Sequence, residues 1–384
     1  MRVAIVHDWL YTIGGAERVL QEMLACYPDA DVFCLFDFLK PEDRAKIGLK
    51  STQTSFLQKL PFVKRSHRVF LPLMPIAIEQ LDLSPYDLII SSSYAVAKGV
   101  LTGPDQLHVS YVHSPIRYAW DLQHTYLARN PNPITSFLAR PLLHWLRVWD
   151  TRTAHGPDMM IANSHFVARR IRKVYGRKAK VLYPPVLLST RSEPLPKKGH
   201  FLAASRLVPY KNIEAIVRAF AELPDQQLVV AGDGPEGARL RKIAGPNVTF
   251  AGFVSDGALR ELMATARAFV FAAEEDFGII SVEAQSEGTP VLALGKGGSC
   301  ETVVDGRTGL FFDTPEPSAI AACVRQFLTR EAEFTPENCR EQAARFSADR
   351  FRDDLRAYVA ETISAYTSSS VGYVPGNRFS TESR

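Results

Sequence analysis

The chain has 384 residues, of which 46% are hydrophobic and 22% are charged, a composition that excludes a disordered or fibrous protein. At roughly 100–200 residues per domain, the length predicts two or three domains. The net charge of +4 is too small to indicate nucleic-acid binding. Residues 1–187 carry 23 basic and 15 acidic side chains, whereas the remainder carries 22 and 26. We therefore expect the front half to meet an anionic surface or ligand.

The cysteines and the apolar segments indicate where the protein works. The five cysteines form no C-x-x-C pair, which excludes a zinc ribbon or a disulfide framework and predicts reduced thiols in a cytosolic protein. Asp8 precedes any apolar segment, so no signal peptide is expected. The longest apolar stretch, around Phe70–Ile78, contains Pro72 and Pro75 and is too short to span a membrane. We expect a soluble cytoplasmic protein, with peripheral membrane association left open.

Short β-branched runs alternate with helical segments along most of the chain. The first expected strands are Val3–Val6, Asp31–Leu35, Asp87–Ser91, His108–Val112 and Met159–Ile161. A second series comprises Phe201–Ala204, Gln227–Ala231, Val248–Ala251, Ala268–Phe271 and Val291–Leu294. Helices are expected between them, at Ala16–Cys26, His165–Tyr175, Ile213–Leu223 and Ala258–Ala266. This alternation predicts an α/β protein with two Rossmann-like domains, each with a parallel sheet built from βαβ units.

The two series are separated by Tyr183–Gly199, which is rich in proline and charge and is interpreted as a linker. The expected domains are residues 1–187 and 188–347. Because ligands bind at the carboxyl ends of parallel strands, the two sheets are expected to face each other across a cleft.

The end of the chain has two predicted parts. Ser347 is placed to cap an amphipathic helix over residues 348–366, which is expected to pack back on the N-terminal domain. Residues 367–384 lack periodicity and are expected to form a disordered tail.

Gly14 and Gly15 lie between the first strand and the next helix, where backbone N–H groups can approach an anion closely. The pattern is neither G-x-G-x-x-G nor a P-loop, which disfavours a dinucleotide dehydrogenase or a P-loop NTPase. Taken alone, such a glycine pair is more often structural.

Arg206 and Lys211 follow the first strand of the second series and precede a helix. A guanidinium and an ammonium at this place suit a diphosphate, because one grips oxygens as a fork and the other acts as a point charge. The alternative is a pair of solvated surface cations.

In the segment Glu274–Glu283, the carboxylates of Glu275 and Glu283 stand on either side of a glycine turn at Gly278. A helix is expected from about Ile279, and its first amides would bind an anion while the carboxylates accept hydrogen bonds from sugar hydroxyls. The alternative is that the acidic residues only complement the helix dipole.

Taken together, these residues resemble glycosyltransferase family 4, whose members are retaining enzymes with the GT-B fold. The resemblance rests on four ordered elements and covers nearly all of residues 1–366. The elements are Gly14-Gly15, His113-Ser114-Pro115, the pair Arg206 and Lys211, and Glu275-x₇-Glu283 followed by Ala284 and Gly288–Val291.

The resemblance implies roles for these positions. Arg206 and Lys211 would hold the donor pyrophosphate, Glu275 would contact the transferred sugar, and Glu283 would bind the ribose. The backbone of Phe277, Gly278, Ile279 and Ile280 would meet sugar and phosphate. The base would lie near Phe253 and Val254, and Gly14 and Gly15 would approach the phosphate or the acceptor.

His113 follows a strand of the first domain, where the family places a residue that touches the donor sugar. A satisfied core histidine is the alternative. The catalytic set implied by the resemblance is His113, Glu275, Arg206 and Lys211. Acceptor contacts are expected at Lys98, Arg117, Tyr118 and Trp120, which include aromatic and cationic groups suited to a sugar.

The resemblance implies transfer with retention, commonly by front-face displacement in which the leaving phosphate helps to deprotonate the acceptor. Arg206, Lys211 and the helix-end amides would stabilise the departing diphosphate electrostatically, so no metal or other cofactor is expected. Asp29-Ala30-Asp31 matches the D-x-D pattern that binds metal in other transferases, but it precedes a first-domain strand and is interpreted as a turn.

Basic and apolar residues interleave in the front half. Lys59, Lys64, Arg65 and Arg68 stand beside Phe56, Leu57, Leu60, Phe62, Val63, Phe70 and Leu71, and the run Arg169–Lys180 contains no acidic residue. This pattern suits an anionic membrane surface, although a solvated helix face is the alternative. Since many relatives glycosylate lipid-linked acceptors at the cytoplasmic leaflet, we expect peripheral association there.

The residues His7–Leu10, Gly14–Arg18 and Val112–Pro115 most resemble bacterial mannosyltransferases of O-antigen or exopolysaccharide synthesis. This favours GDP-mannose as donor and a polyprenyl-diphosphate-linked glycan as acceptor, with no nucleic-acid partner. A UDP-sugar donor, such as UDP-glucose, stays open. A sugar-nucleotide epimerase or a non-catalytic glycan- or membrane-binding protein are further alternatives, disfavoured because Arg206, Lys211 and Glu275 are all present. Linkage and oligomeric state are not predicted.

Overall fold

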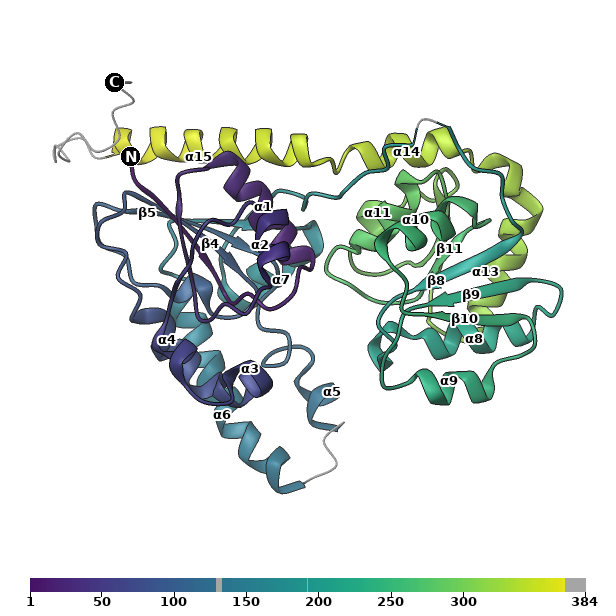
Figure 1. Cartoon of the computed structure of the whole chain (residues 1–384), viewed down its shortest axis with the longest axis horizontal. Coiled ribbons are helices and arrows are strands. Elements are labelled where there is room, and N and C mark those ends of the chain that lie inside the picture. Colours follow the sequence, from purple (N-terminus) through teal and green to yellow (C-terminus); the bar gives the residue numbers. More distant parts are fainter. Residues whose placement is uncertain (129–132, 192, 370–384) are drawn as a thin grey trace. The chain divides into compact units, whose positions relative to one another are not determined.

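The computed structural model describes residues 1–128, 133–191 and 193–369. The chain divides into two compact units, one formed by Met1–Pro185 with the C-terminal segment from Phe351, the other by Val186–Arg350. Each unit contains its own parallel sheet (Figure 1). The predicted cleft between the domains concerns their relative placement and stays a prediction.

The first unit has a seven-stranded sheet in the order β3-β2-β1-β4-β5-β6-β7, and all pairings are parallel. Its strands are β1 (Val3–His7), β2 (Asp31–Cys34), β3 (Gln53–Thr54), β4 (Leu88–Ser93), β5 (Leu107–Val112), β6 (Met159–Ala162) and β7 (Lys180–Val181). β4 and β5 are buried throughout, as expected for strands that are covered on both faces.

Helices cover both faces of this sheet. They are α1 (Gly15–Cys26), α2 (Pro41–Lys46), α3 (Val63–Ser66), α4 (Met74–Glu79), α5 (Gln123–Ala128), α6 (Pro133–Thr153), α7 (His165–Tyr175) and α15 (Ala348–Ser369), with 3₁₀ turns η1 (Phe56–Lys59), η2 (His67–Leu73) and η3 (Ala97–Gly99). Alternate strand residues point to opposite faces, so Val6 packs with α4 and α6, whereas Ile5 packs with α1 and α15. Ser347 caps α15 through the N–H of Arg350 at 3.3 Å.

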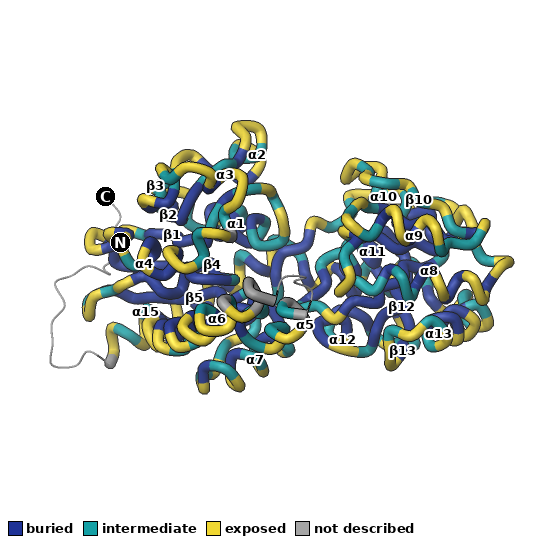
Figure 2. The backbone as a smooth tube through the Cα atoms, turned by 90° about the horizontal axis from the view of Figure 1, so that it is seen from below, coloured by how far each residue is buried: buried dark blue, intermediate teal, exposed yellow. Residues whose placement is uncertain are grey.

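The second unit has a six-stranded parallel sheet in the order β10-β9-β8-β11-β12-β13. The strands are β8 (His200–Ala204), β9 (Gln227–Ala231), β10 (Val248–Gly252), β11 (Phe269–Phe271), β12 (Val291–Leu294) and β13 (Gly309–Phe312). The helices are α8 (Ile213–Ala221), α9 (Gly237–Ile243), α10 (Asp256–Thr265), α11 (Ile279–Ser286), α12 (Ser299–Thr302), α13 (Pro317–Arg330) and α14 (Pro336–Ala344), with η4 (Pro209–Lys211) and η5 (Glu331–Glu333). Figure 2 shows central strands of each unit, such as β4 and β12, as buried, whereas the edge strands β3 and β10 are partly exposed.

Both sheets share one topology. Numbered within its own unit, each sheet has the order 3-2-1-4-5-6 in its first six strands, so the direction of winding reverses between β1 and β4 and between β8 and β11. Ligands of doubly wound sheets bind outside the carboxyl ends of the strands at this switch point. The prediction of two Rossmann-like domains is confirmed, and the expected ligand sites are the loops after β1, β4, β8 and β11.

Two predictions about the chain's end have different outcomes. α15 runs to Ser369, so the helix continues past its predicted end at residue 366, and residues 367–369 do not belong to a tail. Residues 370–384, the rest of the predicted tail, lie outside the described residues. Within the described ranges, no helix is both long and apolar enough to cross a membrane.

Candidate active site

The loop after β8 presents the two predicted phosphate-binding cations. Arg206 is exposed, and its guanidinium donates to the hydroxyl of Tyr210 at 3.3 Å. Lys211 ends η4, and Asn212 follows in the left-handed region with φ 54°. The side chain of Asn212 donates to the carbonyl of Ala272 at 2.9 Å, which ties this loop to the one after β11.

The loop after β11 brings Glu275 to Lys211. The Lys211 ammonium forms an ion pair with Glu275 Oε1, although 64 positions separate the two residues in the chain. Both side chains are largely shielded from water, whereas the neighbouring Glu274 is exposed. Two of the predicted catalytic residues therefore meet at the switch point of the second sheet.

Glycines allow the loops of this site to approach each other closely. A Cβ at Gly298 would lie 2.3 Å from the Cα of Phe277, and the Gly298 N–H donates to the Glu275 carbonyl at 2.8 Å. Gly232, with φ +120°, lies so close to the Ser205 carbonyl oxygen that a Cβ would come within 1.9 Å. These contacts fix the backbone beside Arg206 and beneath Glu275.

The N-terminus of α11 lies directly after this loop. Gly278 precedes the helix with φ 87°, a conformation that glycine adopts without strain. The first amides of the helix, at Ile279 and Ile280, have no acceptor within the helix and would favour an anion. Two buried hydroxyls, of Ser281 in the first turn and of Ser299 in α12, have no hydrogen-bond partner among the described residues. Glu283 follows in the next turn of α11 and is half-buried.

The loop after β10 carries the predicted base-binding residues. Phe253 is 87% exposed, and Val254 packs at the edge of the apolar cluster under α10 and α11. A solvent-facing aromatic ring of this kind offers a stacking surface at little cost.

On the first unit, His113 lies just past the end of β5 and is held from β4. The ring Nε2 atom lies 2.9 Å from Ser92 Oγ, and Ser92 Oγ lies 3.1 Å from Nδ1 of His7 at the end of β1. Burial, aided by His7, lowers the pKa of His113 to about 3, so this imidazole is neutral at physiological pH.

The loop after β4 is fixed by Asp8. This fully buried carboxylate accepts four backbone hydrogen bonds of 2.6–2.9 Å, from the N–H groups of Tyr94, Ala95, Val96 and Ala97. Burial raises the pKa of Asp8, while these hydrogen bonds oppose the rise. Asp8 thus connects β1 to the neighbouring strand at the switch point.

The predicted glycine loop of this unit is attached to the same group of residues. Gly14 precedes α1, and its N–H donates at 2.8 Å to Oε2 of Glu17 in the first turn. Oε1 of Glu17 lies 3.5 Å from Nε2 of His7. Gly14 is exposed and Gly15 half-exposed, so the loop backbone is accessible.

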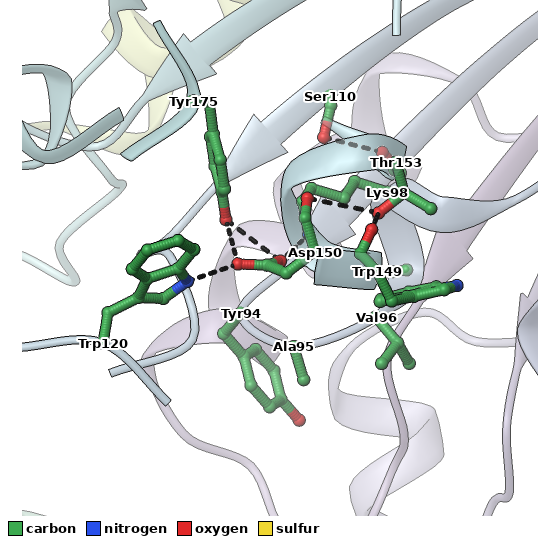
Figure 3. Close-up of polar contacts among 12 residues, drawn as sticks. Tyr94, Ala95, Val96, Lys98, Ser110, Trp120, Trp149, Asp150, Thr153 and Tyr175 are labelled. Atoms are coloured by element: carbon green, nitrogen blue, oxygen red, sulfur yellow. Dashed lines mark hydrogen bonds and ion pairs between the residues drawn. The ribbon is translucent and has the colours of Figure 1, made fainter. Parts of the chain in front are cut away.

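One of the predicted acceptor contacts, at Lys98, is corrected by the structure. Lys98 is 1% exposed and forms a buried ion pair with Asp150, because η3 turns its side chain under α6. Trp120 donates its indole N–H to the same carboxylate at 2.7 Å, and Tyr175 adds hydrogen bonds of 3.0 and 3.1 Å (Figure 3). Lys98 is therefore structural, and the only polar group of the Trp120 side chain is already used. Arg117, Tyr118 and Trp120 are half-buried, and their contact with an acceptor stays a prediction.

Only some of the cations in the basic run Arg169–Lys180 are available to contact a membrane. Arg170 contacts Asp121 and donates to Ser114 at 2.8 Å. Arg177 donates to backbone carbonyls near the start of β6. These two cations hold the first unit together, which leaves fewer charges for a membrane than the sequence indicates.

The D-x-D string has a structural explanation. Asp31 begins β2 and accepts a hydrogen bond of 2.7 Å from the Tyr86 hydroxyl. Over residues 1–128, 133–191 and 193–369, no three His, Cys, Asp or Glu side chains form a group that could hold a metal ion. Metal independence itself stays a prediction.

Two family models match the chain on either side of residue 189. The model of glycosyltransferase family 4 matches residues 13–189, and that of group 1 glycosyl transferases matches residues 189–346. The chain belongs to glycosyltransferase family 4. The first match includes the Gly14 loop and His113, and the second includes Arg206, Lys211 and Glu275.

Curated relatives match about half of the chain. The chain is 30% identical over 224 residues to a D-inositol 3-phosphate glycosyltransferase of Nocardioides, which is 48% of this chain and 49% of that protein. It is 29% identical over 208 residues to a GDP-mannose-dependent alpha-(1-6)-phosphatidylinositol monomannoside mannosyltransferase of Mycobacterium tuberculosis, which is 46% and 54%. The chain thus spans about half the length of the relatives it matches.

Solved structures establish the fold of this family 4 member. The Anabaena protein HepE in complex with UDP and glucose superimposes with a TM-score of 0.68 at 21% identity, covering 95% of this chain and all of that one. Sucrose-phosphate synthase from Thermosynechococcus elongatus gives 0.70 at 19% identity, covering 95% and 100%. The predicted GT-B fold is confirmed.

Several residues at the two switch points were missed by sequence reasoning. They are Tyr210, Asn212, Ser281 and Ser299 in the second unit and Glu17, Ser92 and Asp8 in the first. His7 and Asp8 could have been recognised from the sequence, because polar residues at the end of a buried strand are unusual. Ser92 and Ser281 could not have been recognised in this way, since serines are common in loops and in the first turns of helices.

Proposed function

We propose that this protein is a retaining glycosyltransferase that transfers mannose from GDP-mannose to a lipid-linked glycan. The observation that carries the proposal is the ion pair of Lys211 with Glu275 at the β8/β11 switch point, directly before the N-terminus of α11, with Arg206 exposed in the same loop as Lys211. Cations and helix-end amides there suit a nucleoside diphosphate, and the carboxylate suits a sugar hydroxyl.

The chemistry demanded by glycosyl transfer is stabilisation of charge on the leaving diphosphate. As the glycosidic C–O bond breaks, a negative charge develops on the β-phosphate oxygen. Arg206 and Lys211 supply fixed positive charge, and the first amides of α11 add aligned dipoles. Glu275 holds Lys211 in position before the donor binds, and its second oxygen remains able to accept a hydrogen bond from the sugar.

The more specific part of the proposal is the identity of the donor, with mannose as its sugar and guanine as its base. They are supported by the likeness to a GDP-mannose-dependent mannosyltransferase at 29% identity and by the resemblance of the residues around His7, Gly14 and His113 to bacterial mannosyltransferases. HepE, solved with UDP and glucose, is 21% identical over 95% of this chain, and a UDP-sugar is the alternative donor. In this proposal Phe253 and Val254 lie against the base, and the 87% exposure of Phe253 supports this role.

The test is a thermal-shift panel with GDP-mannose, UDP-glucose, ADP-glucose and dTDP-glucose, all at one common concentration of about 100 times the dissociation constant for GDP-mannose. Selective binding of GDP-mannose stabilises the protein by about 2.7 kcal/mol at that ratio, and Arg206→Gln removes the shift. Stabilisation by UDP-glucose alone would overturn the mannose assignment, and no shift with any donor would overturn the transferase proposal.

The acceptor side of the proposal is an anionic membrane surface bound by the first unit. Between residues 56 and 76, apolar side chains stand in water beside exposed basic ones. Phe62 is 75% and Val69 73% exposed, and Phe56, Leu73 and Ile76 are also exposed, with Lys59, Lys64 and Arg65 among them. Figure 1 draws α3, α4 and α6 at the same end of this unit, and α6 adds the exposed Phe137 and Val148.

Insertion of apolar side chains and attraction to anionic lipids act together at such a surface. Each basic residue near an anionic surface contributes about 1 kcal/mol, an effect that salt weakens. We therefore expect the protein to float with vesicles containing phosphatidylglycerol at low salt. The double variant Phe62→Ser/Val69→Ser loses this binding, whereas Leu101→Ser, at an exposed apolar residue of the same unit, keeps it. Equal flotation of both variants would contradict this surface.

A further inference from the structure

We infer that Glu17, His7 and Ser92 are positioning residues that fix the tautomer of His113, so that its Nδ1 accepts a hydrogen bond from a substrate hydroxyl. The inference rests on the proposed function for the identity of the substrate but not for the state of the ring. It concerns three buried residues of α1, β1 and β4, none of which was assigned a role by the sequence.

The four side chains form one continuous polar chain. Glu17 Oε1 lies 3.5 Å from His7 Nε2, His7 Nδ1 lies 3.1 Å from Ser92 Oγ, and Ser92 Oγ lies 2.9 Å from His113 Nε2. Glu17, His7 and Ser92 are buried, so water does not compete for these contacts. Each distance is within hydrogen-bond range.

The direction of the chain follows from its carboxylate end. Glu17 can only accept, and its Oε2 already accepts the N–H of Gly14 at 2.8 Å. The proton between Glu17 and His7 therefore belongs to His7 Nε2. A neutral imidazole has one N–H, so Nδ1 of His7 must accept from the Ser92 hydroxyl.

The Ser92 hydroxyl has one proton, which it donates in the hydrogen bond to His7 Nδ1. In any second hydrogen bond its oxygen can therefore only accept. In the contact between Ser92 Oγ and His113 Nε2, His113 Nε2 is consequently the protonated donor and Ser92 Oγ the acceptor. A neutral His113 that carries its proton on Nε2 has its lone pair on Nδ1. The low pKa of this ring, about 3 as a result of burial, agrees with the neutral form.

The charge of His7 decides the direction. If His7 were protonated, it would donate to Ser92, Ser92 would donate to His113, and the proton of His113 would move to Nδ1. The separation of 3.5 Å between His7 and Glu17 is longer than the about 2.7–2.9 Å of a charge-assisted bond. We propose the arrangement with the neutral ring; the two arrangements place the His113 proton on different nitrogens, which the experiment below distinguishes.

The result is a selective acceptor. His113 is only half-buried. In the described part of the chain, its Nδ1 atom makes no hydrogen bond and is not one of the fully buried, unpartnered polar atoms. A lone pair at this atom accepts from a sugar hydroxyl and repels an ether or carbonyl oxygen. The glycine loop contributes through Gly14 and Glu17, so the loop and the imidazole are set by one hydrogen-bonded chain.

The experiment is long-range ¹H–¹⁵N NMR of the full chain labelled at histidine, with His7→Gln and His113→Gln used for assignment. We expect His113 in the wild type to show a protonated Nε2 and an unprotonated Nδ1. Ser92→Ala should shift the His113 and His7 signals and lower turnover about tenfold, the loss of one hydrogen bond's contribution.

A matched control lies one residue away on β4. The hydroxyl of Ser91 contacts His108 at 2.8 Å and Ser110 at 2.9 Å, so Ser91→Ala should alter the signals of His108 and leave those of His113 unchanged. A wild-type His113 protonated on Nδ1, or His113 signals unchanged by Ser92→Ala, would overturn the inference. A protein with the expected tautomer but no transfer from any sugar nucleotide would instead overturn the proposed function alone.

Discussion

The ammonium of Lys211 and the carboxylate of Glu275 form an ion pair across the switch point of the second sheet. Lys211 comes from the loop after β8 and Glu275 from the loop after β11, and both loops are fixed by close backbone contacts at glycines. We propose that the pair holds Lys211 in place before a donor arrives, and that an incoming diphosphate would compete with Glu275 for the same charge.

Removal of either cation should strongly lower the rate of transfer while leaving the fold intact. We expect Arg206→Gln and Lys211→Met to lower kcat on the order of 10²–10³-fold, because each removes fixed charge that stabilises the leaving diphosphate. Steady-state transfer kinetics and the unfolding midpoint should be measured together. Arg218→Gln is the control, since Arg218 forms an exposed ion pair with Glu214 on α8; equal loss in this variant would show that the effect is not specific.

Glu275 should behave differently from its neighbour Glu274. Glu275→Gln keeps the shape of the side chain but removes the charge that holds Lys211, so we expect a loss of at least tenfold in kcat/KM for the donor. Glu274 is exposed, and Glu274→Gln should stay within twofold of the wild type. Similar values for both variants would contradict the assignment of Glu275 to the site.

The sequence predicted the strands and helices well because their signals are local. All ten expected strands are present, since each is a short apolar run between polar residues. The strands that were missed, β3, β7 and β13, are either two residues long or carry a glycine and aromatic residues that give little pattern. The helix α6 was missed because Pro141 and several charged residues interrupt its apolar pattern.

The site was predicted less completely, because its geometry depends on contacts between distant segments. From its neighbours in the sequence, Lys98 is expected to be an exposed cation in a loop. Only the three-dimensional structure, in which Asp150 of α6 pairs with it, shows that it is buried. The pairing of Lys211 with Glu275 likewise depends on the order of β8 and β11 in the sheet. Motif resemblance placed both residues in one site but gave no information about their contact.

Gly232 should not tolerate a side chain. Its φ of +120° strains any other residue, and a Cβ would overlap the Ser205 carbonyl oxygen, so Gly232→Ala should lower the free energy of unfolding by about 3 kcal/mol. Because Ser205 precedes Arg206, donor affinity should fall as well. Gly257→Ala, in α10 with open space around it, should raise stability by up to about 1 kcal/mol. Denaturant unfolding of both variants tests this, and a stable Gly232→Ala protein would contradict the packing described.

The first unit should lose stability in mild acid because of His108. This imidazole is fully buried, Nδ1 has no partner, and burial with a smaller contribution from Arg177 lowers its pKa to about 3. In the unfolded chain the pKa is about 6.5, so between pH 6.5 and 3 the unfolded state binds the extra proton. The free energy of unfolding therefore falls with pH by up to about 1.4 kcal/mol per unit below pH 6.5.

The measurement is denaturant unfolding at pH 7 and pH 5. His108→Gln keeps a polar partner for Ser91 but cannot take up a proton, so it should show a smaller loss between the two values than the wild type. His155→Gln, at an exposed position, should lose as much as the wild type. An undiminished loss in His108→Gln would mean that other groups cause the acid sensitivity.

The most direct test of the central claim is transfer of labelled mannose by the purified full chain. GDP-[¹⁴C]mannose would be incubated with bacterial membranes, the protein and EDTA, and the organic-extractable label counted, with Lys211→Met as the matched inactive protein. We expect label to enter the lipid fraction with the wild type and to fall at least 100-fold with the variant. Equal labelling by both proteins, or no labelling from GDP-mannose while UDP-glucose is transferred, would contradict it.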